Sequence, residues 1–252
     1  MKLATILAGA ATLALIAGAA WQSGAAGSIP DSIAKAVANP ARPDADRDRD
    51  PLRKPAEVLA FAGVKSGETV LELIPGGGYF TRLLSGAVGA KGHVTEAVPQ
   101  TGGGDVRQTS NGVAADPHFA NVTETPMTPD ALAKAGPVDL VWTSQNYHDL
   151  HLARLKVDVV ALDKVIFAAL KPGGEFFIED HAAAAGSGIG DVDKMHRIDE
   201  AFVKQEVESV GFKLDGESDI LRNPADTHTL LVFDPAIRGH TDQFLLRFKK
   251  PK

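Results

Sequence analysis

Residues 69–81 read TVLELIPGGGYFT, and this stretch decides the fold. Its first half is a short apolar run with one acid, Glu72, which is typical of a strand buried on both faces of a parallel sheet. The glycines that follow let the backbone approach a ligand without an intervening side chain. A helix is expected over residues 79–88, and its first turn offers unpaired N–H groups to a ligand. The stretch therefore predicts a strand, a ligand-binding turn and a helix in succession.

The rest of the chain continues this alternation of strands and helices. Further strands are predicted at residues 93–98, 121–125, 138–143 and 175–179. Helices are predicted at residues 55–62, 157–170 and 193–210. Two last apolar runs, 229–233 and 243–248, are expected to pair as an antiparallel hairpin. This order predicts an α/β fold with a doubly wound, mostly parallel sheet, in which ligands bind beyond the carboxyl ends of the strands.

The N-terminal part of the chain differs from this pattern. Residues 1–26 carry one lysine and a short Ala- and Leu-rich apolar run, which indicates a cleaved secretory signal and a periplasmic or secreted location. An uncleaved anchor is the alternative, but the run only just reaches spanning length, so no stable membrane insertion is expected after cleavage. Residues 27–54 contain four prolines and an alternating Asp/Arg run. They are interpreted as a solvated polar leader before a domain at residues 55–252. Folding of Arg47, Arg49 and Arg53 over a pocket mouth is the alternative for the leader.

Composition excludes several classes of function. The formal net charge is -6, which argues against nucleic acid as a partner, because phosphate binding needs a basic face. The chain has no cysteine, which excludes disulfides, thiolate nucleophiles and cysteine-based zinc sites. No Gly-x-Ser-x-Gly turn is present, which counts against the usual kind of esterase. A small-molecule substrate fits best, and the sequence does not specify an oligomeric state.

Polar residues gather where the fourth and fifth predicted strands end. Residues 144–151 read SQNYHDLH, and Asp180 and His181 follow the fifth strand. Because the carboxyl ends of neighbouring parallel strands meet at one edge, we expect His148, Asp149, Asp180 and His181 to converge. Histidine suits proton abstraction near neutral pH. The sequence therefore predicts His148 or His181 as a catalytic base, oriented by Asp149 or Asp180.

Other interpretations of the polar residues stay open. The histidines could serve only to hydrogen-bond loops, or, together with His151, could bind a metal such as zinc. No tight ligand spacing supports a metal site, so none is predicted. The charges of the late helix, among them His196 and Arg197, are interpreted as a solvated face. Residues 100–118 are interpreted as a flexible insertion.

Two stretches of the chain carry a resemblance to a known family. Residues 62–81 resemble the first motif of the class I S-adenosylmethionine-dependent methyltransferases, and residues 170–176 resemble the lead into their fifth strand. Shorter segments resemble an exported branch of predicted bacterial methyltransferases: residues 146–149, 179–181, 221–224 and 238–242. The resemblance implies a Rossmann-like seven-stranded sheet and S-adenosylmethionine as the cofactor. It assigns cofactor binding to Glu72, Pro75, Gly76, Gly77, Gly78, Tyr79 and Asn146.

Two positions depart from the pattern of that family. Ile74 stands where the first glycine of the motif is usual, and Val98 stands where an acid usually holds the ribose hydroxyls. Glu96 lies two residues earlier, on the same face of the predicted strand. The expected function is methyl transfer to a small molecule in the periplasm. The alternative is an exported ligand- or metal-binding protein on a methyltransferase-like fold.

Overall fold

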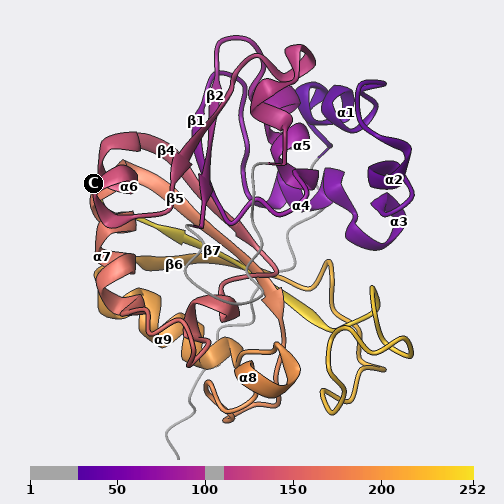
Figure 1. Cartoon of the computed structure of the whole chain (residues 1–252), viewed down its shortest axis with the longest axis vertical. Helices are drawn as coiled ribbons and strands as arrows, with labels where there is room; N and C mark the ends of the chain where they lie inside the picture. Colours follow the sequence, from indigo (N-terminus) through magenta and orange to yellow (C-terminus); the bar gives the residue numbers. More distant parts are fainter. Residues whose placement is uncertain (1–27, 100–110) are drawn as a thin grey trace, which may run out of the picture.

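The structure is a computed structural model that describes residues 28–99 and 111–252. The expected secretory signal at residues 1–26 lies outside the described residues. The strands are β1 (Thr69–Leu73), β2 (His93–Val98), β3 (Val122–Pro126), β4 (Val138–Ser144), β5 (Leu170–His181), β6 (Lys213–Ser218) and β7 (Gln243–Lys249). Within the described residues they form one sheet in the order β3-β2-β1-β4-β5-β7-β6 (Figure 1). The first five run parallel and β7 runs antiparallel between β5 and β6, which confirms the predicted α/β sheet.

Helices cover both faces of the sheet, because alternate strand residues are apolar on both sides. In β4, Leu140 and Trp142 belong to one buried cluster and Val141 to the other. The helices on the first face are α1 (Asp31–Val37), α4 (Pro55–Phe61) and α5 (Tyr79–Val88) (Figure 1). Those on the second face are α6 (Pro129–Ala135), α7 (Val159–Ala169) and α9 (Glu200–Ser209). Among the described residues, no helix has the length and apolar character needed to cross a bilayer.

The N-terminal segment 28–54 is folded onto the domain, so the expectation of a solvated leader is wrong. It forms α1 and two short helices, α2 (Asp44–Arg47) and α3 (Asp50–Arg53). Ile33 of α1 is fully buried, and Ala36 packs so closely on α5 that a side chain at Gly86 would collide with it. Two acids of the run pair with arginines elsewhere in the fold, Asp46 with Arg82 and Asp50 with Arg42. A sequence pattern of alternating charge does not distinguish such pairing from solvation.

The C-terminal antiparallel pair has a different first strand from the one predicted. β7 pairs with β6, whereas residues 229–233 form no strand and lie as an irregular surface segment. Only Val232 of that apolar run is fully buried, and Phe233 is 53% exposed. The strand β6 was missed because the alternation in its sequence, KLDGES, places few apolar residues on either face.

The predicted late helix over residues 193–210 is broken in the middle. It consists of α8 (Val192–Met195) and α9, separated where His196 adopts a left-handed backbone with φ 53°. Ile198 in the break forms a parallel bridge to Ala182, just beyond β5. The predicted solvated face is therefore wrong at Arg197, which is fully buried at the break.

The expected flexible insertion at residues 100–118 is in part a folded segment. Residues 100–110 lie outside the described residues. The remainder contains two 3-10 turns, η1 (Val113–Ala115) and η2 (Pro117–Phe119). Val113 and Phe119 are buried against the first face of the sheet, so residues 111–118 belong to the packed domain.

Candidate active site

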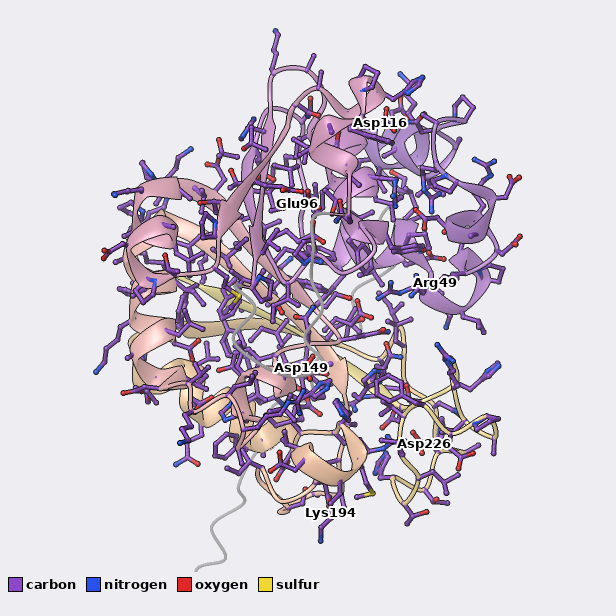
Figure 2. The ribbon with its side chains drawn as sticks, viewed as in Figure 1. Arg49, Glu96, Asp116, Asp149, Lys194 and Asp226 are labelled. Atoms are coloured by element: carbon purple, nitrogen blue, oxygen red, sulfur yellow. The ribbon has the colours of Figure 1, made fainter. Side chains whose placement is uncertain are left out.

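A cavity of about 210 Å³ opens at the carboxyl end of the sheet, between β1 and β4. Strand order reverses at this point, which is where open α/β sheets bind their ligands. Figure 2 shows that its lining comes from separate elements, with Arg49 on the N-terminal helices and Asp149 after β4. The lining residues are Arg49, Arg53, Glu72, Ile74, Pro75, Gly76, Gly77, Tyr79, Phe80, Ser144, Gln145, Asn146 and Asp149. Of the residues predicted to bind a cofactor, all but Gly78 are in this lining.

The turn after β1 keeps the backbone shape of a glycine-rich motif despite Ile74. Ile74 has φ 51°, in the left-handed region that glycine adopts without strain, and Gly76 and Gly78 also have positive φ. The Asn146 side-chain amide donates to the Ile74 carbonyl at 2.8 Å and so links the turn to the end of β4. Gly78 precedes α5, and a side chain there would collide with Val113. The departure at Ile74 therefore changes the residue and not the turn.

Glu72 lies at the buried base of the cavity in a small network of polar side chains. The Thr81 hydroxyl is 2.7 Å from a Glu72 oxygen and 2.8 Å from a Glu96 oxygen. One hydroxyl donates one proton, so the second contact requires a proton on one of the carboxyl groups. Burial raises the pKa of Glu72 to about 8 and raises the pKa of Glu96 as well. At neutral pH and without a cationic ligand, a proton is therefore shared in this network.

At the end of β2, Val98 stands where the family pattern places an acid. Glu96 does not replace it, because its carboxylate turns inward and accepts a hydrogen bond from the Asn111 side-chain amide at 2.6 Å. Glu96 is fully buried and is not part of the cavity lining. Among residues 28–99 and 111–252, the cavity lining thus offers Glu72 as its acid beside the glycine-rich turn.

Of the three arginines that the alternative interpretation of the N-terminal segment named, Arg49 and Arg53 line the cavity and Arg47 does not. The Arg53 guanidinium lies 4.5 Å from the Tyr79 ring centre and 4.7 Å from that of Phe80, and it donates to the Ser144 hydroxyl at 3.0 Å. Its Nε is buried and has no hydrogen-bond partner. Burial and the neighbouring Arg53 lower the pKa of Arg49. Two adjacent, partly buried cations provide a favourable site for an anionic group.

Asp50 holds Tyr79, whose ring both Arg49 and Arg53 approach. The Tyr79 hydroxyl donates to an Asp50 oxygen at 2.6 Å, and the buried Arg42 guanidinium pairs with the same carboxylate. Sequence analysis favoured solvation for these residues because it treated the Asp/Arg run as one charged stretch. The usable signal was the pair Arg49 and Arg53, which are four residues apart and so share one side of a helical turn.

The polar residues after β4 and β5 converge as predicted, beside the cavity. His148 begins the turn η3 (His148–His151), and its Nδ1 lies 2.7 Å from an oxygen of Asp180, at the end of β5. The other Asp180 oxygen accepts the backbone N–H of His148 at 2.7 Å. Asp149 is 3.3 Å from His148 Nε2, and the His181 ring centre is 5.9 Å from that of His148. Asp180 therefore fixes both the backbone and the ring of His148.

The two predicted bases differ sharply in their surroundings. Burial would lower the pKa of His148, but Asp180 and Asp149 raise it overall. Burial lowers the pKa of His181 well below its ordinary value, and its Nδ1 is 2.8 Å from the Thr241 hydroxyl. His148 is thus the one with an orienting carboxylate, supplied by Asp180. His151 points elsewhere, with Nε2 3.0 Å from Glu206.

A third histidine, missed as a site residue, completes the group. The Nδ1 of His196 lies 3.2 Å from His148 Nε2 and 3.4 Å from an Asp149 oxygen. His196 comes from the break between α8 and α9, which sequence periodicity did not show. Its only sequence signal was its polarity inside an amphipathic pattern, and that is the ordinary signature of an exposed helix face.

Comparison with known proteins gives matches at the level of structure. No family model matches the chain, and no curated protein matches it. It is similar to a SAM-dependent methyltransferase from Aquifex aeolicus, with TM-score 0.54 and 18% identity over 83% of this chain and 98% of that one. It is also similar to an arsenic(III) S-adenosylmethionine methyltransferase from Chlamydomonas reinhardtii, with TM-score 0.53 and 17% identity over 88% of this chain and 74% of that one. The fold is that of the S-adenosylmethionine-dependent methyltransferases.

The methyltransferase fold accounts for the position of the cavity but not for everything around it. The glycine-rich turn, Glu72 and Asn146 sit at the strand ends where this fold binds ligands. Arg49 and Arg53 come from the N-terminal segment 28–54. The histidine group lies at the ends of β4 and β5 and at the break after α8, and it consists of His148, Asp149, Asp180, His181 and His196. The site therefore places two cations and a buried acid around one ligand space, next to the histidines and Asp149.

Proposed function

We propose that this protein transfers a methyl group from S-adenosylmethionine to a small molecule. The observation that carries the proposal is the cavity at the strand-order reversal, lined by the glycine-rich turn, Glu72 and Asn146 on one side and by Arg49 and Arg53 on the other. When bound, S-adenosylmethionine supplies an electrophilic methyl group on a sulfonium. The protein's task is then to align an acceptor with that methyl group and to exclude water.

The residues of the cavity fit the methionine end of this cofactor. That end carries a carboxylate and an ammonium group. The buried Arg53 Nε without a partner is the kind of donor that a carboxylate satisfies, and Arg49 adds a second positive charge. Glu72, at the base of the cavity, would accept the ammonium group, and this charge would favour the ionised form of its carboxyl. Asn146 is already committed to the Ile74 carbonyl and would act by holding the turn.

The histidine group would act on the methyl acceptor, because Asp149 belongs both to this group and to the cavity lining. His148 Nδ1 lies against Asp180, so in the neutral imidazole the proton is on Nδ1 and the Nε2 lone pair lies next to Asp149 and His196. A lone pair in that place supports the prediction of His148 as a base for an acceptor that carries a proton. It equally suits a bound cation, and the two uses exclude each other.

Titration calorimetry tests the cofactor proposal directly. We expect saturable one-to-one binding of S-adenosylhomocysteine, the demethylated product, to the mature protein. Binding of S-adenosylmethionine followed by mass spectrometry of small-molecule extracts would then identify the methyl acceptor. Absence of binding of both compounds at millimolar concentration would contradict the proposal.

Location in the periplasm is proposed on the secretory signal expected at residues 1–26. The test is the intact mass of the protein from a fractionated bacterial host. We expect a periplasmic species that lacks the apolar run. A full-length species in the cytoplasm would contradict the proposal and would leave the cofactor proposal untouched.

A further inference from the structure

Three polar atoms beside the cavity form a nearly equilateral triangle. They are His148 Nε2, His196 Nδ1 and one carboxylate oxygen of Asp149, and their separations are 3.2, 3.3 and 3.4 Å. Their side chains come from η3 and from the break after α8, so the triangle is made by the tertiary fold. No other group of three or more potential ligands with this spacing occurs among the described residues.

The size of the triangle matches one face of a metal tetrahedron. Zinc binds imidazole nitrogen at about 2.0–2.1 Å and carboxylate oxygen at about 2.0–2.2 Å in tetrahedral sites. Ligand atoms at those distances lie about 3.3–3.5 Å from one another around a tetrahedral ion. An ion placed just above the triangle would therefore reach all three atoms without movement of the backbone.

Asp180 supplies the outer contact that metal-binding histidines ordinarily have. It is fully buried, and one of its oxygens accepts a hydrogen bond from His148 Nδ1 at 2.7 Å, while its second oxygen accepts one from the His148 backbone N–H. A carboxylate on the far nitrogen fixes the ring and, in the neutral imidazole, places the lone pair on Nε2, which is the form that coordinates a metal. A histidine that served only to bond a loop would not need both ring nitrogens arranged in this way.

The fold holds His196 in place at a cost in backbone strain. Its φ of 53° is in the left-handed region, which is unfavourable for a residue with a side chain. The next residue, Arg197, is fully buried and is anchored by Asp226 at 2.8 Å and by the Ala182 carbonyl at 3.0 Å. The strained conformation is thus fixed by a buried ion pair, and its effect is to aim the His196 imidazole at His148.

We propose that His148, Asp149 and His196 bind one divalent transition-metal ion, with Asp180 as the outer partner of His148. Two imidazoles and one carboxylate are the donor set of zinc and neighbouring ions, and they disfavour magnesium and calcium, which prefer oxygen ligands. Three protein ligands leave a fourth position open, as in metal sites that act on a substrate. Because Asp149 also lines the cavity, that position is next to the ligand space. The proposal does not depend on methyl transfer.

The test is zinc binding by untagged mature protein from which metal has been removed with a chelator. Calorimetry measures the binding, and elemental analysis after gel filtration measures the amount of bound zinc. We expect one zinc ion per chain, and a cobalt(II) visible spectrum typical of tetrahedral coordination. His196→Asn is the main variant, because asparagine tolerates the left-handed conformation and should keep the fold. We expect it to lose stoichiometric zinc. Asp180→Asn should weaken zinc binding about 10–100-fold through loss of the outer contact.

His118→Ala is the matched control, because His118 also pairs with an aspartate, Asp116, but lies on the surface away from the triangle. It should bind zinc as the unchanged protein does. Near-ultraviolet circular dichroism of each variant establishes that it is folded. The proposal is overturned if the unchanged protein binds no stoichiometric zinc, or if folded His196→Asn and Asp149→Asn retain the zinc affinity of the unchanged protein.

Discussion

The glycine-rich side of the cavity and the histidine group differ in how the chain builds them. Glu72, Ile74, the glycines and Tyr79 lie within one short stretch, so local backbone geometry creates most of that side. The histidine group joins residues 32 and 48 positions apart, His148 with Asp180 and His148 with His196. Only the packing of β4, β5 and the break after α8 brings them together. A contiguous motif therefore specifies a local backbone shape. A cluster of side chains depends instead on strand order and on contacts between residues that are distant in the sequence.

The buried ion pair of Arg197 with Asp226, which anchors the chain next to His196, gives the strongest test of this difference. Arg197→Met would leave the buried Asp226 carboxylate without its partner. Breaking a buried ion pair from one side costs about 3–5 kcal/mol. We expect a decrease of that size in the free energy of unfolding, measured by urea denaturation at constant pH. Arg154→Met, at an exposed position, is the control and should change it by less than about 0.5 kcal/mol. Equal effects of the two variants would contradict the anchoring role.

Opposite the glycine-rich turn, Arg53 should have a large effect on affinity. Because Arg53 also pairs with the buried Glu179 at 3.8 Å, its loss should lower stability as well. Arg53→Ala removes the guanidinium proposed to meet the cofactor carboxylate. Hydrogen bonds to charged groups contribute about 1.5–3 kcal/mol, so the affinity for S-adenosylhomocysteine should fall about 10–100-fold. Calorimetry measures the change. Arg47→Ala is the control, since Arg47 pairs with the exposed Asp44 and does not line the cavity. Unchanged affinity of Arg53→Ala would remove the arginine from the proposed site.

The buried acid of the cavity should make stability depend on pH. Folding raises the pKa of Glu72 from 4.5 to about 8, so the folded state favours the protonated form. The resulting stabilisation is complete below the unfolded pKa and is lost as pH rises through about 8. We expect the free energy of unfolding to fall between these two values, and Glu72→Gln to reduce the slope. Some slope should remain, because burial also raises the pKa of Asp163, on the other face, to about 8. An unchanged slope would contradict the protonated state.

The smallest expected effect compares the two strained residues, one from each side. Ile74 and His196 both have positive φ. Replacement by alanine removes each side chain beyond the β-carbon, and replacement by glycine removes the β-carbon as well, so the two products differ mainly in backbone preference. We expect each glycine variant to be more stable than its alanine counterpart by about 1 kcal/mol, measured by thermal unfolding. Greater stability of the alanine variant at either position would show that its left-handed backbone carries no strain.

Sequence patterns predicted the fold well because strand and helix periods are local properties. The helix over residues 79–88 and the strands over residues 69–73 and 93–98 have the predicted bounds. The errors fall where tertiary contacts override the local pattern. Arg197 breaks a helix that periodicity favoured, because its buried ion pair stabilises a different path of the chain. Residues 229–233 are apolar enough for a strand but pack as a surface segment, while β6 forms without an apolar pattern because β7 offers it a partner.

The candidate site was predictable in the same unequal way. Pairs of residues that directly follow strands, such as His148 and Asp180, could be placed together from strand order alone. The assignments of catalytic and cofactor-binding roles stay predictions. His196 could not be assigned to the site, and Arg49 and Arg53 entered only as an alternative, because their elements reach the site through packing that no local pattern records. Ile74 is the opposite case, because its residue type departs from the motif while its backbone conformation follows it.

The position of Arg53 and Lys54 also determines when the cavity can be completed during folding. Arg53 donates to Ser144, 91 residues later, and the Lys54 ammonium donates to the Ile220 carbonyl, 166 residues later at 2.7 Å. Closing loops of that length costs entropy before the contacts repay it. The contact between Asp50 and Tyr79 spans only 29 residues and needs no such closure. The wall of the cavity that Arg53 supplies is thus completed only when Ser144, 91 residues later, is in place.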